Sequence, residues 1–143
     1  MSSASTLSAE LTAKLLRRLA REWEELNWML FRSRLKRPLL ELTRSERTLG
    51  QWRAGTRTLS LSLPAILSRP WLDTVETLKH EMAHQFVDEV LGGEARPHGP
   101  AFQEVCRQRG IDARTSAPAE APQRAEVAED RVIKRIRKLL ALA

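Results

Sequence analysis

Three histidines in one short window are the residues of this chain best suited to chemistry. His80 and His84 lie in the segment His-Glu-Met-Ala-His, His98 follows fourteen residues later, and the chain has no other histidine. Histidines at positions i and i+4 of a helix share a face, so their imidazole nitrogens can bind one metal ion. Three protein ligands with a fourth position open to water are typical of catalytic zinc. The sequence therefore predicts one Zn²⁺ per chain, bound by neutral imidazoles.

Glu81 is the candidate catalytic residue. It is turned about 100° around the helix from His80, so its carboxylate can reach water held on the metal without being a ligand. There it would act as general base, taking a proton as the water attacks a carbonyl carbon and passing it to the leaving amine. Peptide hydrolysis is the reaction that most naturally uses this set of residues.

Two alternatives apply to the same window. Glu104 lies twenty residues after His84, a spacing that thermolysin-like enzymes use for a glutamate as third ligand. We favour His98, because it directly follows the Gly92-Gly93 pair, where the chain can reverse, whereas Glu104 lies deeper in the next helix. The other alternative is that the three histidines are hydrogen-bonded core residues without a metal.

Helices and a small sheet are expected to position these residues. Apolar residues at helical spacing predict a long helix over residues 8–31, and a capping box of Asp73 and Glu76 would begin the metal-binding helix. A short helix should follow His98 and stop at Gly110, with three residues facing inward: Phe102, Val105 and Cys106. Strands are expected at 39–43 and in a hairpin of residues 46–53 and 57–63. The predicted fold is α+β and zincin-like, with a small, mostly antiparallel sheet.

Composition favours an intracellular protein with one main domain. The chain has 143 residues and one cysteine, Cys106, so it cannot form an intrachain disulfide. Its N-terminus lacks a signal-peptide pattern, and no apolar run is long enough to span a bilayer. We therefore expect a cytoplasmic location and no stable membrane association.

Basic residues are concentrated in one stretch. Between Arg32 and Arg57 there are eight basic residues and two acidic ones, an excess equal to the net charge of +6 of the whole chain. Such a field favours a polyanion, most simply DNA, and would place the protein at the nucleoid, whereas the alternative is an ordinary solvated surface. The candidate nucleic-acid contacts are Arg32, Arg34, Lys36, Arg37, Arg44, Arg47 and Arg53.

The chain is expected to divide into three parts. Residues 1–112 would form the zinc-binding domain, and residues 113–128, rich in Ala, Pro and Glu, a linker. Residues 129–143 have the spacing of a basic amphipathic helix. That helix could dock on the core or on a partner, lie on DNA or a membrane surface, fray, or begin a second, truncated domain.

Between Leu15 and Asp112 the chain resembles the SprT-like family of zinc metalloproteases, which includes the Spartan proteases of DNA–protein crosslink repair. The resemblance implies zinc at His80, His84 and His98, Glu81 as catalytic base, and cleavage of proteins bound or crosslinked to DNA. The chain lacks the cysteine-based zinc module that follows the protease core in many relatives. The segments that carry the resemblance are Leu26–Phe31, Arg34–Pro38, Leu49–Gly50, Arg57–Ser62, Thr77–His84 and His98–Phe102.

The sequence thus favours a metalloprotease that acts on DNA-associated proteins. A substrate strand would add to the edge of the sheet near residues 57–63, beside the metal-binding helix. One alternative is a zinc-stabilised DNA-binding module without turnover, which has no need of Glu81. Another is a zinc hydrolase with a non-peptide substrate.

Overall fold

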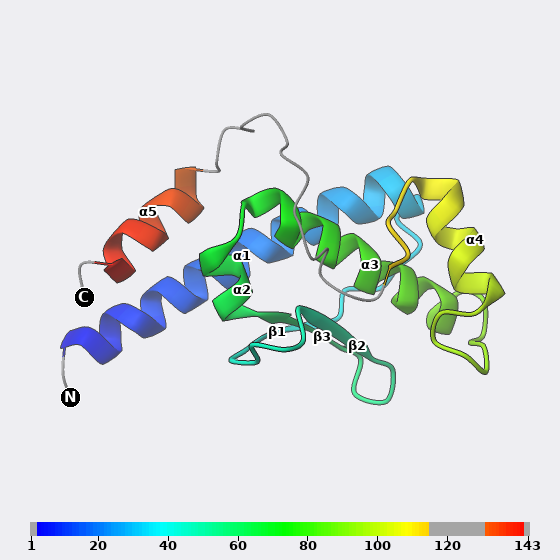
Figure 1. The fold of residues 1–143 in the computed structure, drawn as a ribbon, viewed down its shortest axis with the longest axis horizontal. Coiled ribbons are helices and arrows are strands. Elements are labelled where there is room, and N and C mark those ends of the chain that lie inside the picture. The colour runs from blue at the N-terminus through cyan, green and yellow to red at the C-terminus, as the bar shows by residue number, and fades with distance from the viewer. Residues whose placement is uncertain (1–2, 115–130, 142–143) are drawn as a thin grey trace.

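Five helices and three strands make up the part of the chain that the computed structural model describes, residues 3–114 and 131–141 (Figure 1). The fold is α+β with a long N-terminal helix, as predicted from the sequence. In chain order the elements are α1 (Ser3–Phe31), β1 (Leu39–Thr43), β2 (Gly50–Arg53), β3 (Thr58–Ser62), α2 (Leu63–Ser68), α3 (Trp71–Glu89), α4 (Pro100–Arg109) and α5 (Arg131–Ala141).

The sheet is mixed, which corrects the expectation of a mostly antiparallel one. Its strand order is β1-β3-β2, with β3 parallel to β1 and antiparallel to β2. The hairpin after β2 reverses the chain, so β3 returns in the direction of β1 and inserts between the other two strands. Because β3 is central, residues 57–63 offer no free edge, and the expected addition of a substrate strand there is wrong. The sheet edge that contacts α3 is β2.

One face of the sheet packs against α1 and α3, and the core lies between these layers (Figure 1). Leu59 and Leu61 of β3 are buried in this core. The apolar stripe of α1 predicted from helical spacing is largely buried with them, because it faces the sheet and α3. Its buried members are Leu11, Leu15, Leu19, Trp23 and Leu26.

The α3 helix begins two residues before the predicted capping box. Its N-cap is Pro70, without a side-chain cap, and Asp73 already lies in the first turn. Proline fixes φ near the value that a helix entry needs, so the helix starts there. The predicted reversal at Gly92-Gly93 is confirmed, since these residues have φ of 83° and 88°, a backbone conformation that glycine adopts without steric cost.

The α5 helix packs on the core. Its residues Ile133 and Ile136 are buried, and α5 contacts α1. Arg137 donates to the backbone oxygens of Ile66, at 2.7 Å, and of Arg69, at the end of α2. Most of the expected linker, from residue 115 onward, lies outside the described residues. None of the helices in the described part is both long and apolar enough to span a bilayer.

Candidate metal centre

The three histidines of the sequence window come together in space. His80 and His84 lie one turn apart on α3, and His98 approaches them from the segment before α4. The Nε2 atom of His98 is 3.2 Å from that of His84 and 3.3 Å from that of His80. One ligand atom from each residue lies within 4.8 Å of the others. These three side chains can therefore hold a single metal ion.

The spacing of these nitrogens fits zinc. Two nitrogens bound at 2.0–2.1 Å in a tetrahedral site lie roughly 3.3 Å apart, close to the two distances found here. Burial lowers the pKa of His84 to about 3, with further lowering by His80 and His98. The pKa of His80 is also lowered, again chiefly by burial. Both imidazoles are thus neutral at pH 7, the form in which histidine binds zinc.

A backbone carbonyl fixes the orientation of His80. Its Nδ1 lies 3.0 Å from the carbonyl oxygen of Asp112. Because a carbonyl can only accept, Nδ1 must carry the proton, and the lone pair of Nε2 is left facing the other two histidines. Asp112 follows α4 and was not among the site residues expected from the sequence.

Phe102 forms the base on which the three histidines rest. Its fully buried ring is stacked on His84, with centroids 4.1 Å apart and planes inclined by 15°. It meets the rings of His80 and His98 edge-on, at 5.0 and 4.9 Å. The sequence predicts that Phe102 faces inward but does not place it under the histidines. One side chain of α4 therefore touches every candidate ligand.

Glu94 holds the segment that carries His98. Its carboxylate accepts hydrogen bonds from the backbone N–H of Phe102, at 2.8 Å, and of Ala101, at 3.3 Å. These are free donors of the first turn of α4, which a carboxylate satisfies well. A Cβ at Gly99 would displace this carboxylate, so glycine at this position leaves room for Glu94 to cap α4. Glu94 was not singled out in the sequence.

Glu81, the predicted base, is buried beside the metal centre. Its side chain faces β2, where Gly50 packs so closely that a Cβ would come within 2.8 Å of Thr77 and 3.2 Å of Glu81. Burial raises the pKa of Glu81 to about 7, while a hydrogen bond from the Trp52 backbone lowers it. The indole of Trp52 also donates to Asp88 two turns further along α3, at 2.8 Å. The β2 strand is thereby fastened to the helix that carries Glu81.

Two further residues lie outside the cluster. Glu104 is exposed on α4 and accepts from Arg107, at 2.9 Å, and from Gln108, at 3.0 Å. It is not among the groups that could share a metal within the described residues. Cys106 is buried, and burial raises its thiol pKa to about 11. It is the core residue that its position on the apolar face of α4 predicts.

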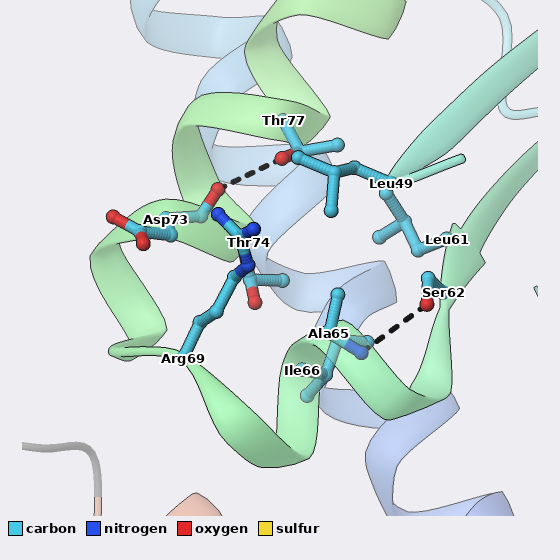
Figure 2. A pocket seen from close by; sticks show the side chains of 9 residues that line it. All are labelled: Leu49, Leu61, Ser62, Ala65, Ile66, Arg69, Asp73, Thr74 and Thr77. Atoms are coloured by element: carbon cyan, nitrogen blue, oxygen red, sulfur yellow. Dashed lines mark hydrogen bonds between the residues drawn. The ribbon is translucent and has the colours of Figure 1, made fainter. Parts of the chain in front are cut away.

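A small pocket near α3 is separate from the metal centre. It lies between α2, the end of β3 and the first turns of α3 (Figure 2), and none of the three histidines lines it. Its lining residues are Leu49, Leu61, Ser62, Ala65, Ile66, Arg69, Asp73, Thr74 and Thr77.

The seven candidate nucleic-acid contacts are all exposed and lie in the segments on either side of β1 and on β2. Arg32, Arg34, Lys36 and Arg37 precede β1, whereas Arg44 and Arg47 follow it, so a strand of five residues separates the two groups. Arg53 on β2 pairs with Glu41 at 3.3 Å.

Comparison with known protein families gives one match, and it covers the segments that carry the three histidines. The sequence model of the SprT-like family matches residues 19–121, most of the chain. The chain belongs to the SprT-like family. The match includes the three histidines, Glu81, Glu94 and Phe102. No match was found among curated proteins or among solved structures.

Proposed function

We propose that this protein is a zinc-dependent metalloprotease that cleaves proteins bound or crosslinked to DNA. The observation that carries the proposal is the meeting of three imidazole nitrogens at distances suited to one zinc ion, with Glu81 buried directly after His80 on the same helix. Membership of the SprT-like family supports peptide hydrolysis over other zinc chemistry.

His80, His84 and His98 would hold the zinc. When bound there, zinc supplies Lewis acidity that polarises a carbonyl and makes hydroxide available near neutral pH. Asp112 orients His80 through its carbonyl oxygen, and Phe102 supports all three rings. The zinc ligands are thus arranged during folding, before any substrate binds.

Glu81 would carry the proton. Its carboxylate takes a proton from the attacking water and returns it to the amine that leaves when the peptide bond breaks. The Trp52 backbone hydrogen bond holds this carboxylate on the β2 side of α3. A substrate in extended conformation would lie along β2, since this edge strand contacts α3.

DNA would be bound through exposed basic residues. The groups on either side of β1 and the exposed Lys134, Arg135 and Lys138 of α5 are available for phosphates. These contacts would bring the protease to its protein substrates.

The test is a cleavage assay on a DNA-binding protein, with and without DNA, using Glu81→Gln beside the parent protein. We expect Glu81→Gln to keep zinc and fold but to lose about 10²–10⁴-fold in rate, the usual effect of removing a general base. Glu104→Gln is the matched control, because it alters in the same way an exposed carboxylate that lies outside the histidine cluster. A Glu81→Gln protein that cleaves as fast as the parent would contradict the assignment of Glu81 as general base. A parent protein that holds zinc but cleaves nothing would leave the zinc-stabilised binding module.

A further inference from the structure

Arginines from distant parts of the sequence meet where α1 and α4 end. The guanidinium carbon of Arg109, on α4, is 4.5 Å from the ring centroid of Phe86, and that of Arg34 is 5.4 Å from the same centroid. Arg109 also covers Phe31, the last residue of α1, at 5.1 Å. Burial lowers the pKa of Arg109, and the positive charges of Arg34 and Arg32 lower it further. Three like charges are therefore held close together; we call Arg32, Arg34 and Arg109 the arginine cluster.

No carboxylate in the described part of the chain forms an ion pair with this cluster. Arg109 donates instead to the backbone oxygen of Leu30, at 2.9 Å. The acidic residues of α4 and the segment after it pair elsewhere, Glu104 with Arg107 and Asp112 with Arg114. Like charges held close together without counter-charges repel one another. Binding of an external anion relieves this repulsion and is therefore favourable.

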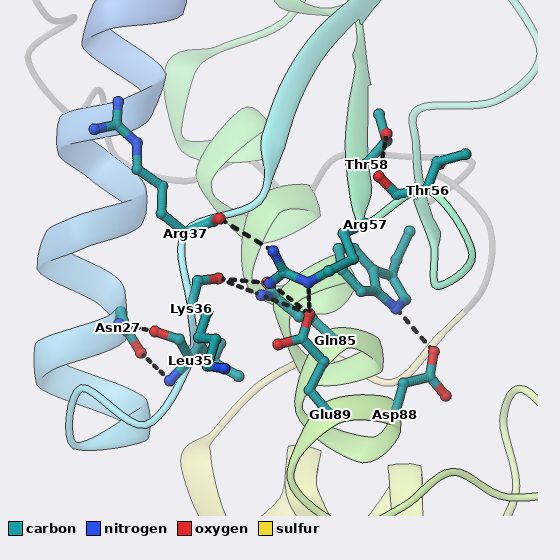
Figure 3. Close-up of polar contacts among 11 residues, drawn as sticks. Asn27, Leu35, Lys36, Arg37, Thr56, Arg57, Thr58, Gln85, Asp88 and Glu89 are labelled. Atoms are coloured by element: carbon teal, nitrogen blue, oxygen red, sulfur yellow. Dashed lines mark hydrogen bonds and ion pairs between the residues drawn. The ribbon is translucent and has the colours of Figure 1, made fainter.

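The backbone that presents Arg32 and Arg34 is held in an uncommon conformation. Arg32 and Ser33 have φ of 52° and 59°, a left-handed geometry that residues other than glycine seldom adopt in succession. The buried side chain of Asn27 maintains it by donating to the Leu35 carbonyl at 3.0 Å and accepting from the Leu35 N–H at 3.1 Å (Figure 3). The two arginines are thus pre-positioned, and binding an anion orders little further chain.

An exposed indole lies beside the cluster. Trp28 is 73% exposed, the most of any large apolar residue described as exposed, and Met29 next to it is 64% exposed. Trp28 lies on α1 three residues before Phe31, which Arg109 covers, and four residues before Arg32, the first residue after the helix. A flat aromatic face next to phosphate-binding cations is the arrangement on which unpaired bases stack.

We infer that Trp28 and the arginine cluster form a binding surface for single-stranded nucleic acid. The indole stacks on a base, and Arg32, Arg34 and Arg109 bind phosphates of the same strand. A duplex fits less well, because its bases are already stacked on one another and offer no free face. Glu24 and Glu25 are exposed one turn before Trp28 and repel phosphates, so the strand runs from Trp28 toward α4. The biological role of this surface rests on the proposed action at DNA, but its binding can be measured without proteolysis.

The test measures binding of the full-length protein to labelled oligodeoxythymidine, oligouridine and a duplex of equal length, by fluorescence anisotropy over a series of salt concentrations. The parent should bind a single strand more tightly than the duplex, and the two single strands tell DNA from RNA. Trp28→Ala should weaken single-strand binding about tenfold or more, as expected for one lost stacking contact, while Trp28→Phe should restore much of it. Met29→Ala is the matched control.

The arginines are tested as pairs of equal charge. Changing Arg32 and Arg34 together to Gln should weaken binding and reduce the slope of log K against log salt by about 0.7 for each lost phosphate contact. The same change at Arg44 and Arg47, beyond the other end of β1, should do less. Equal losses from both pairs, or a Trp28→Ala protein that binds like the parent, would overturn the inference. If the parent cleaves a DNA-free protein yet binds no oligonucleotide, the proposed nucleic-acid surface is wrong and the proposed proteolysis is supported. If the parent binds oligonucleotides but cleaves no protein, the surface is supported and the proposed proteolysis is wrong.

Discussion

The metal centre and the basic stretch differ in what holds their side chains in place. The three histidines are fixed by α3, by the ring of Phe102 and, for His80, by the Asp112 carbonyl. The basic residues of 32–57 lie mainly in the segments on either side of β1, with exposed side chains. Packing sets the geometry of the metal centre. The basic side chains are mostly exposed, and they differ from one another in the contacts that they make.

Arg57 illustrates the difference within the basic stretch. Its guanidinium donates to Glu89 at 2.8 Å and to the backbone oxygens of Lys36 and Arg37 at 3.2 and 3.4 Å (Figure 3). It therefore joins the β2–β3 hairpin to α3 and to the segment before β1. In the sequence, Arg57 and Arg37 each contribute one positive charge. In the structure, Arg57 connects three segments, whereas the exposed side chain of Arg37 is available to contact nucleic acid.

Loss of Phe102 should have the largest effect on stability. Phe102→Ala removes a fully buried ring, which typically costs about 3–5 kcal/mol of unfolding free energy, and it also removes the support of all three histidines. Denaturant unfolding with and without zinc should show a smaller stabilisation by zinc than in the parent, with Phe102→Leu intermediate. If the variant gains as much stability from zinc as the parent does, Phe102 is only a core residue.

Loss of Glu94 should have a moderate effect. Glu94→Ala leaves two N–H groups of the first turn of α4 without their acceptor, and the loss of such a cap costs about 1–2 kcal/mol. Because the same segment carries His98, zinc affinity should fall as well, measured by competition with a chelator. Glu104→Ala, on the exposed face of α4, should leave zinc affinity unchanged; a similar loss in both variants would contradict this role of Glu94.

Loss of Arg57 should have the smallest of these effects. Its side chain is 41% exposed, so Arg57→Gln should cost only about 1 kcal/mol despite several hydrogen bonds. Nucleic-acid affinity should change little beyond the general effect of one charge. Arg37→Gln should show the opposite pattern, with stability unchanged and weaker binding in anisotropy. Identical behaviour of the two variants would remove the distinction drawn within the basic stretch.

The parts of the fold that the sequence predicted depend on local patterns. The spacing of Leu15, Leu19 and Trp23 indicates α1, and the His80–His84 spacing with the Gly92-Gly93 pair places the histidines, because helix geometry and glycine turns are local properties. The parallel pairing of β1 with β3 was missed, since it depends on contacts between strands distant in sequence.

The supporting residues of the metal centre were missed for a similar reason. Glu94, Asp112 and Trp52 act through a carboxylate or a backbone atom that reaches another element, and residue type alone does not reveal such a contact. The arginine cluster, too, depends on Arg109, more than seventy residues beyond Arg34 in the sequence. Packing of α4 against α3 brings Arg109 to the end of α1, where Arg32 and Arg34 lie.

The most direct test of the account is the zinc content of three proteins purified without added metal: the parent, His98→Ala and Glu104→Ala. Because the nitrogens of His80, His84 and His98 converge while Glu104 pairs with Arg107 at the surface, the parent and Glu104→Ala should each hold about one zinc per chain. His98→Ala should hold little. A Glu104→Ala protein without zinc, beside a His98→Ala protein that keeps it, would contradict the account.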